Sequence, residues 1–198
     1  MFKTYYKYGV MNSSKTASLL MAAHNYQDKH QPTFFITPQQ DTRADHLIKA
    51  RIGLSQKPDL VLTDFNHDLK VLLNSAVAIG AIVFVDECQF VPYNLVKQMV
   101  DYCHECEYNN NLSSDACLMA YGLLKDFNNH LFDGSRAWLE EADSIHEIKT
   151  VCHYCNHKAT INYLKGNHPD SNIQIGDQEY LPVCSRCYYA LQRGDRPE

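Results

Sequence analysis

The sequence lacks an excess of basic residues. Its 18 lysines and arginines are outnumbered by 23 aspartates and glutamates, which gives a net charge of −5 at pH 7. A protein that holds nucleic acid mainly through the phosphates needs a basic surface. We therefore expect no nucleic-acid partner.

Long apolar runs are also missing. The longest, residues 76–85, is too short to cross a bilayer as a helix. The first five residues lack the apolar core of a signal peptide. We expect a soluble, cytoplasmic protein without a membrane partner. Its 198 residues, 45% of them hydrophobic, are enough for one full-sized domain and a small appendage.

Disulfide bonds are not expected in a cytoplasmic protein, because the cytosol keeps thiols reduced. Six of the eight cysteines form three Cys-x-x-Cys pairs. Two of these pairs lie in a C-terminal segment with little material for a core, and two such turns favour tetrahedral structural zinc. The predicted zinc ligands are Cys152, Cys155, Cys184 and Cys187. We interpret the third pair, Cys103 and Cys106, as part of a helix, with Cys103 in the core. Cys88 and Cys117 are expected to be buried bystanders.

Apolar strand-like segments alternate with helical ones along most of the chain. We predict strands at 2–8, 33–37, 60–62, 82–85 and 117–121, and helices at 15–29, 68–78, 92–105 and from Ala137 onward. This alternation is typical of an α/β fold with a parallel sheet and helices on both faces. Residues 38–58 show no clear periodicity, and a loop of that length is usually functional or disordered. We place a boundary between a nucleotide-binding domain, 1–147, and a zinc-binding domain, 148–198.

Residues 9–16 match the phosphate-binding pattern Gly-x-x-x-x-Gly-Lys-[Ser/Thr], with serine in place of the second glycine. In this loop Lys15 would contact the β- and γ-phosphates and Thr16 would offer a hydroxyl to Mg²⁺, while backbone N–H groups surround the phosphates. Serine fits the glycine position if its dihedral angles stay helical. The alternative is a simple strand-to-helix turn capped by Ser13 or Ser14. The predicted ATP-binding residues here are Gly9, Met11, Asn12, Ser13, Ser14, Lys15 and Thr16.

The apolar strand at 82–85 is followed by two acids, Asp86 and Glu87. Adjacent residues on a strand point in different directions, so one acid can join a Mg²⁺ shell while the other accepts a proton. The alternative is that the pair caps the next helix, near Pro92. Together with the phosphate loop, the acids indicate an ATP-using phosphoryl-transfer enzyme.

Residues 86–90, together with residues 11–16, closely resemble the cytosolic thymidine kinases of the tetrameric, zinc-containing type, in a bacterial or phage-like form. Further matches are Asp41-Thr42-Arg43, Arg51-Ile52-Gly53, Tyr121-Gly122-Leu123, Asp126-Phe127 with Phe132, and Ile175-Gly176 before Tyr180. The resemblance runs from Tyr5 to about Tyr189. It implies a RecA-like P-loop fold with a zinc-ribbon-like domain that carries a loop, or lasso, over the substrate.

The resemblance also implies a role for each matching residue. Glu87 would be the base that takes the proton from the nucleoside 5′-hydroxyl. Asp86 and Gln89 would belong to the ATP-binding residues, and Asp41 and Arg43 would organise the metal and phosphates. The remaining residues would form the thymine pocket: Met11, Phe90, Leu123, Phe127 and Phe132 as its walls, and Ile175, Gly176 and Tyr180 as its cover.

The resulting hypothesis is transfer of the γ-phosphoryl group of ATP to thymidine, and to deoxyuridine, with Mg²⁺ and structural Zn²⁺. By resemblance, the enzyme would be a homotetramer inhibited by thymidine triphosphate. Two alternatives remain at this point. One is a P-loop ATPase whose zinc ribbon binds nucleic acid or protein, and the other is a weakly active nucleotide-binding relative, for which Ser14 is the main support. The lasso is also one residue shorter than is usual in the family.

Overall fold

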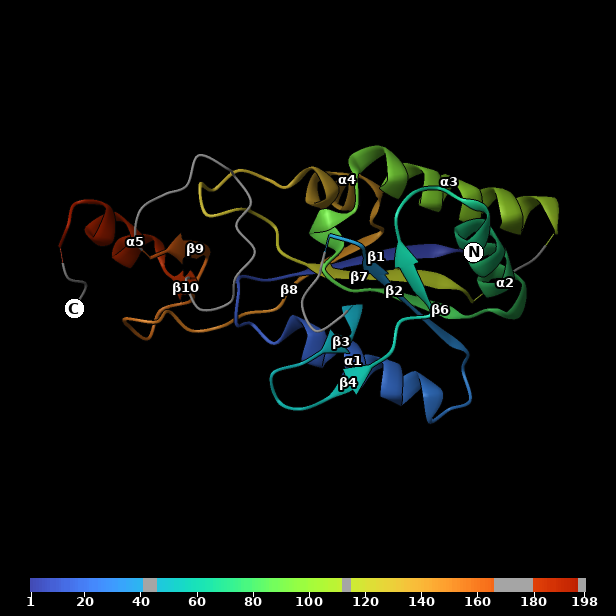
Figure 1. Ribbon diagram of the computed structural model, residues 1–198, viewed down its shortest axis with the longest axis horizontal. Helices are drawn as coiled ribbons and strands as arrows, with labels where there is room; N and C mark the ends of the chain where they lie inside the picture. Colours follow the sequence, from blue (N-terminus) through green and yellow to red (C-terminus); the bar gives the residue numbers. More distant parts are fainter. Residues whose placement is uncertain (41–45, 112–114, 166–179, 196–198) are drawn as a thin grey trace.

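The computed structural model describes residues 1–40, 46–111, 115–165 and 180–195, and its centre is a six-stranded sheet (Figure 1). The strands are β1 (Lys3–Tyr8), β2 (Thr33–Pro38), β5 (Leu60–Leu62), β6 (Ile82–Val85), β7 (Cys117–Gly122) and β8 (Ser144–Glu147). They lie in the order β5-β2-β6-β7-β1-β8, and all of their pairings are parallel. The strand that leads into the phosphate loop, β1, is separated from the acid-bearing strand, β6, by β7. This is the RecA-like arrangement.

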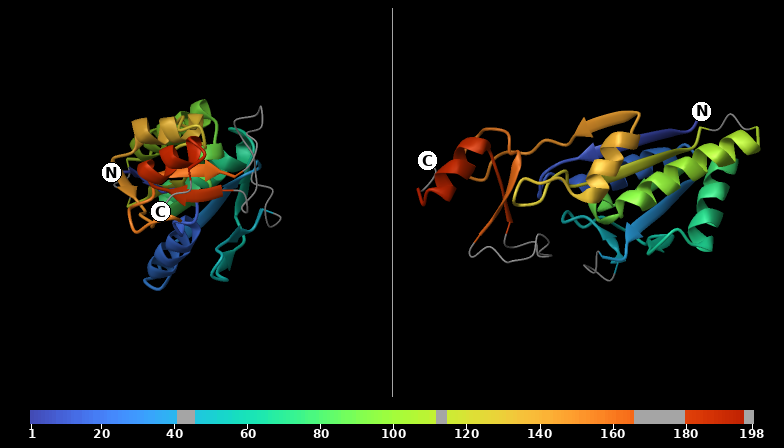
Figure 2. Two further views of the ribbon diagram at one scale, coloured as in Figure 1. Left: turned by 90° about the vertical axis from the view of Figure 1, so that its left-hand side faces the viewer. Right: turned by 90° about the horizontal axis from the view of Figure 1, so that it is seen from above.

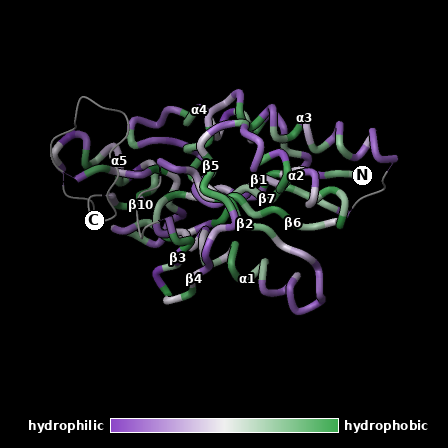
Figure 3. The backbone as a smooth tube through the Cα atoms, turned by 45° about the vertical axis from the view of Figure 1, so that its right-hand side comes forward, coloured by the Kyte–Doolittle hydropathy of each residue, from purple (hydrophilic) through white to green (hydrophobic). Residues whose placement is uncertain are grey.

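Helices cover both faces of the sheet, as predicted. Helix α1 (Lys15–Gln27) packs on one face, and α2 (His67–Ile79), α3 (Tyr93–Asn109) and α4 (Asp133–Glu141) pack on the other (Figure 1). On the α1 face, Leu19 packs with Phe35 and Phe84. On the opposite face, Met99 and Trp138 lie in a larger core. Strand β6 is buried at all four residues, which explains its continuously apolar sequence (Figure 3).

Three local predictions are wrong. Helix α4 begins at Asp133 and not at Ala137, so Gly134 lies in its first turn. Strand β8 was not predicted, because its residues are mostly polar and it pairs only with β1 at the edge of the sheet. A hairpin of β3 (Ile48–Lys49) and β4 (Ser55–Gln56) lies in the segment expected to have no regular structure.

The C-terminal part lies beyond the carboxyl edge of the sheet (Figure 2). It consists of the antiparallel strands β9 (Ile161–Leu164) and β10 (Tyr180–Val183) and of helix α5 (Ser185–Gln192). Four cysteines, Cys152, Cys155, Cys184 and Cys187, belong to its small hydrophobic core. Four predicted site residues, Asp41, Arg43, Ile175 and Gly176, lie outside the described residues.

The remaining cysteines follow the prediction except Cys106, which was expected to be incidental and is buried in the core. Cys88 and Cys117 are buried in the part of the chain that is built on the six-stranded sheet, which we call the main lobe. Cys103 and Cys106 both point from α3 into the core. Among the described residues, none of the helices combines the length and the apolar character needed to cross a bilayer.

Candidate active site

The phosphate loop and the acids of β6 meet at the carboxyl edge of the sheet. The Thr16 hydroxyl lies 3.3 and 3.2 Å from the two carboxylate oxygens of Asp86. The Lys15 ammonium donates to the carbonyl oxygen of Val10 at 2.9 Å, which holds it across the loop. Residues 70 positions apart in the chain therefore form one polar cluster.

The loop itself departs from the expected backbone. Ser14 is the N-cap of α1 in the left-handed conformation, with φ 61° and ψ 33°, and makes no side-chain cap hydrogen bond. The expectation of helical dihedral angles at Ser14 is therefore wrong, and the position is one that favours glycine. The buried Ser13 hydroxyl has no hydrogen-bond partner among the described residues, so neither serine caps the helix.

Gly9, the first glycine of the loop, lies where other atoms of the chain leave no room for a side chain. An added Cβ on Gly9 would lie 2.3 Å from the Ser13 Oγ atom and 2.5 Å from the Ile148 carbonyl oxygen. The Gly9 N–H donates to the Gly122 carbonyl oxygen at 3.2 Å, which joins the loop to the end of β7. The Ser13 hydroxyl therefore lies under the loop, and Ser13 can serve a phosphate through its backbone.

Arg51 brings a second cation to the phosphate loop. It lies in the turn between β3 and β4 and donates to the side-chain oxygen of Asn12, which itself has a φ of 62°. Ile48 and Ala50 anchor this hairpin, because they are buried in the core beneath α1. Arg51 belongs to one of the segments that resemble the family, but nothing in the neighbouring sequence predicted that it lies beside Asn12.

Glu87 is held by Gln89. The Gln89 amide nitrogen donates to Glu87 Oε2 at 2.6 Å, and its amide oxygen accepts the Leu123 N–H at 2.9 Å. Only 3% of Gln89 is exposed. This geometry favours a positioning role for Gln89 over the predicted contact with ATP. The reading of the acids as helix caps is not supported, since the N-cap of α3 is Pro92 and no side-chain cap bond is made there.

The turn that carries Glu87 is braced by α4. Glu87 has a left-handed φ of 45° and precedes the short 3-10 helix Cys88–Phe90. The Trp138 indole N–H donates to the Cys88 carbonyl oxygen at 3.1 Å. A Cβ on Gly134 would lie 2.3 Å from the Val91 carbonyl oxygen, so only glycine lets α4 come this close. Burial, and then the charges of Glu87 and Asp86, raise the pKa of the Cys88 thiol well above its usual value. Cys88 is therefore a neutral packing residue.

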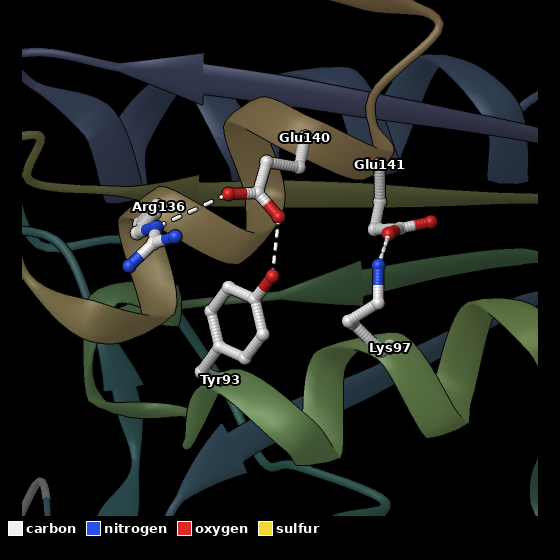
Figure 4. A network of polar contacts seen from close by, with 5 residues as sticks. All are labelled: Tyr93, Lys97, Arg136, Glu140 and Glu141. Carbon is white, nitrogen blue, oxygen red and sulfur yellow. Dashed lines mark hydrogen bonds and ion pairs between the residues drawn. The ribbon is translucent and has the colours of Figure 1, made fainter.

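Helix α4 is in turn fixed to α3 by surface contacts (Figure 4). The Tyr93 hydroxyl donates to Glu140, and the Lys97 ammonium donates to Glu141. Arg136 donates to the same Glu140 carboxylate at 3.1 Å. This helix pair is a firm support behind the acidic turn.

Two groups of apolar side chains border this polar cluster. Phe127, Leu164 and Tyr180 are buried together with Met11 packed against them, and the Phe127 and Tyr180 ring centroids are 6.3 Å apart. Phe90 and Phe132 form an edge-to-face pair at 6.1 Å. Leu123 follows β7, and its carbonyl oxygen accepts from Tyr6 and Ser135 at 2.8 and 2.6 Å. Leu164 was missed in the sequence, because an apolar residue in a short strand has no distinguishing signal.

The four predicted metal ligands come together. The Sγ atoms of Cys152, Cys155, Cys184 and Cys187 all lie within 4.8 Å of one another. Cys155 is 3.6 Å from both Cys184 and Cys187. A tetrahedral zinc–thiolate centre with bonds of about 2.3 Å needs sulfur atoms about 3.8 Å apart, so the set fits zinc. The His157 Nδ1 atom lies 3.3 Å from Cys155 Sγ, where it can contact the ligand sulfur without replacing it.

These observations define a class: a P-loop phosphotransferase fold with a four-cysteine structural metal site. A family model described as "Thymidine kinase" matches residues 3–188. The chain is 36% identical over 199 residues to the thymidine kinase of Streptococcus agalactiae, covering 96% of this chain and 98% of that one. It is 36% identical to the thymidine kinase of Enterococcus faecalis, covering 96% and 95% of the two chains. For the thymidine kinase of Lactococcus lactis the identity is 37%, with coverage of 96% and 98%.

The chain belongs to the thymidine kinase family, as its sequence motifs indicated, and it is a kinase. Among solved structures, Pif1 helicase from Candida albicans superposes with a TM-score of 0.42 and 13% identity. That match covers 74% of this chain but only 36% of the helicase, and nothing about this protein is inferred from it.

Proposed function

We propose that the protein transfers the γ-phosphoryl group of ATP to the 5′-hydroxyl of thymidine, and of deoxyuridine, giving the nucleoside monophosphate in nucleotide salvage. The observation that carries this proposal is the contact of the phosphate loop with Asp86, the residue before Glu87, together with the packing of Met11 of that loop against Phe127 and Tyr180. Family membership along residues 3–188 supports the choice of substrate.

In the proposed mechanism, the backbone N–H groups of the loop and the Lys15 ammonium hold the donor phosphates. A hydroxyl and a carboxylate that face each other at 3.2 Å, those of Thr16 and Asp86, are suitable oxygen ligands for Mg²⁺ beside a nucleotide. When bound, Mg²⁺ would neutralise charge on the β- and γ-phosphates. Arg51, in contact with Asn12, would add positive charge beside the loop.

Glu87 would accept the proton of the 5′-hydroxyl as the oxygen attacks phosphorus. Its hydrogen bond from Gln89 would hold the carboxylate in orientation for this step. The nucleoside base would pack among Met11, Phe127 and Tyr180, which places the sugar between base pocket and phosphate loop. Phosphoryl transfer depends mainly on such positioning and on electrostatic stabilisation.

The test is incubation of the purified protein with Mg²⁺-ATP and a panel of nucleosides, with monophosphate formation measured by chromatography. Thymidine should be the best acceptor, followed by deoxyuridine. Glu87→Gln should lower kcat by about a hundred- to ten-thousand-fold, the range for a positioned base, while thymidine still binds with nearly the same affinity. Near-normal turnover of this variant, with normal zinc content, would eliminate Glu87 as the base.

Several finer features are part of the same proposal and come from the family resemblance. Asp41 and Arg43 would organise metal and phosphates, and Ile175 and Gly176 would cover the base. Residues 1–147 and 148–198 would form separate domains. The protein would act in the cytoplasm as a homotetramer and be inhibited by thymidine triphosphate. Light scattering would test the tetramer against the 22.7 kDa chain mass, and inhibition kinetics would test the triphosphate.

The two alternatives are less well supported. A DNA-binding P-loop ATPase would show salt-dependent DNA affinity and ATP hydrolysis without a nucleoside. A weak nucleotide-binding relative would bind ATP but form no monophosphate in the nucleoside panel. Its main support, Ser14, is offset by the presence of Lys15, Thr16 and Glu87 in the sequence and by the contact between Thr16 and Asp86.

A further inference from the structure

The two faces of the β9–β10 ribbon pack against different hydrophobic clusters. Side chains alternate along a strand, and the pairing of Tyr180 with Leu164 and of Pro182 with Asn162 sets which residues share a face. Ile161, Tyr163, Leu181 and Val183 pack in the core with the cysteines. Leu164 and Tyr180 pack instead with Phe127 and Met11 of the main lobe. The ribbon therefore connects the metal site to the proposed base pocket.

Asn162 lies on this second face and makes two polar contacts with the main lobe. Its side-chain oxygen accepts the backbone N–H of Met11 at 2.7 Å. Its side-chain nitrogen donates to the backbone carbonyl of Lys125 at 3.2 Å. Only 5% of Asn162 is exposed, so both hydrogen bonds lie in a region with little water. An asparagine supplies the required acceptor and donor on one short side chain.

The two backbone groups belong to two different parts of the proposed active site. Met11 lies in the phosphate loop, and its side chain also packs against the base-pocket cluster. Lys125 forms a β-bridge with Leu131 that closes the loop carrying Phe127. Inside that loop, Asp126 accepts the backbone N–H groups of Asn128 and His130 at 2.8 and 2.9 Å, which keeps it compact. One amide thus joins the ribbon, the phosphate loop and the Phe127 loop.

We propose that Asn162 is a positioning residue that couples nucleoside binding to the shape of the phosphate loop. A nucleoside that packs against Phe127 and Tyr180 fixes the ribbon and the Phe127 loop. Through Asn162 this same event fixes the backbone at Met11, where the ATP phosphates bind. Each ligand then favours the arrangement that the other needs, which is a coupling between two sites. This inference rests on the proposed kinase function.

A merely structural role for Asn162 makes a different prediction. If the amide only attached the C-terminal part to the main lobe, its loss would lower stability and affect both ligands independently. Under the coupling role, each ligand still binds, but binding of one no longer improves binding of the other. The distinguishing measurement is therefore the ratio of affinities for a non-hydrolysable ATP analogue without and with saturating thymidine.

The experiment compares the full-length zinc protein with Asn162→Leu, which is similar in size and loses both hydrogen bonds. Asn74→Leu, the same exchange at an exposed position on α2, is the matched control. In the wild type and the control, thymidine should tighten analogue binding severalfold by calorimetry. In Asn162→Leu this ratio should fall to about one. Its kcat/KM should fall by about tenfold to a hundredfold, since two buried backbone groups lose their partners. Zinc content should stay at one ion per chain.

Asn162→Asp is the second variant and serves if Asn162→Leu does not fold. It keeps the acceptor for the Met11 N–H but places a second acceptor opposite the Lys125 carbonyl, so the affinity ratio should be reduced. The coupling would be overturned if the affinity ratio of the wild-type protein were one. It would also be overturned if the Asn162 variant that folds had the same affinity ratio as the wild type. Failure of the kinase proposal is separate, because the wild-type protein would then form no monophosphate with any nucleoside.

Discussion

The serine in the phosphate loop leads to a quantitative prediction. Ser14 adopts φ 61° and ψ 33°, a left-handed conformation that costs a non-glycine residue roughly 1–2 kcal/mol. Its hydroxyl makes no cap hydrogen bond to offset this cost. Glycine removes the conformational cost but adds about 0.4–1 kcal/mol of chain entropy to the unfolded state. With the middle of each range, the difference leaves Ser14→Gly more stable than the wild type by about 0.8 kcal/mol.

The assay is thermal and urea unfolding of the zinc-loaded protein, with ATP affinity measured on the same samples. A gain of this size raises the midpoint of a chain this long by roughly 1–4 °C. ATP affinity should stay the same or improve, because glycine leaves more room near the phosphates. Ser14→Ala is the control and should match the wild type within about 0.5 kcal/mol, since no hydrogen bond is lost. Destabilisation of Ser14→Gly, or a large loss of ATP binding, would refute this account of the loop.

Three further predictions concern parts that support the acids or the proposed base pocket. Gln89→Leu should lower kcat about tenfold or more in steady-state assays, because Glu87 loses the donor that orients it, and a change below twofold would contradict that role. Gly134→Ala places a methyl group 2.3 Å from the Val91 carbonyl oxygen, so urea unfolding should show a free energy of unfolding lower by about 1–3 kcal/mol. An unchanged free energy of unfolding would disprove the close contact. Removal of zinc by a chelator should abolish turnover while circular dichroism keeps most of the helical signal, because the metal supports Leu164 and Tyr180 but not the main sheet. Full turnover of metal-free protein, with metal content measured, would exclude this dependence.

Much of the fold could be predicted because its signals are local. The continuous apolar run of β6 and the periodic apolar positions of α3 identify their elements without reference to any distant residue. The start of α4 could not be predicted in this way. In the sequence, Gly134 is typical of a break before a helix. In the structure it lies inside α4, and glycine is required there because the Val91 carbonyl oxygen, on a turn 43 residues earlier in the chain, leaves no room for a Cβ atom.

The same distinction applies to the candidate site. Lys15, Thr16, Asp86 and Glu87 stand in short motifs whose chemistry is readable from spacing alone. Asn162 carries no such signal, because its partner Met11 is 151 positions away. Arg51 reaches Asn12 only because Ile48 and Ala50 bury the base of the hairpin under α1. Sequence motifs therefore predict the reacting groups, and the structure was needed to find the residues that contact them.

Three non-glycine residues of the site, Asn12, Ser14 and Glu87, share left-handed backbone conformations. Such conformations persist only where surrounding contacts determine them. At Glu87 these contacts are the Gln89 amide and the bond from Trp138 to the turn that follows. Trp138 lies on α4, which the surface pairs with α3 keep in place. Helix packing on one face of the sheet thus supports the turn that carries the proposed base. Glu87 is therefore held by groups of the protein itself, and such preorganisation is what a phosphoryl-transfer site requires.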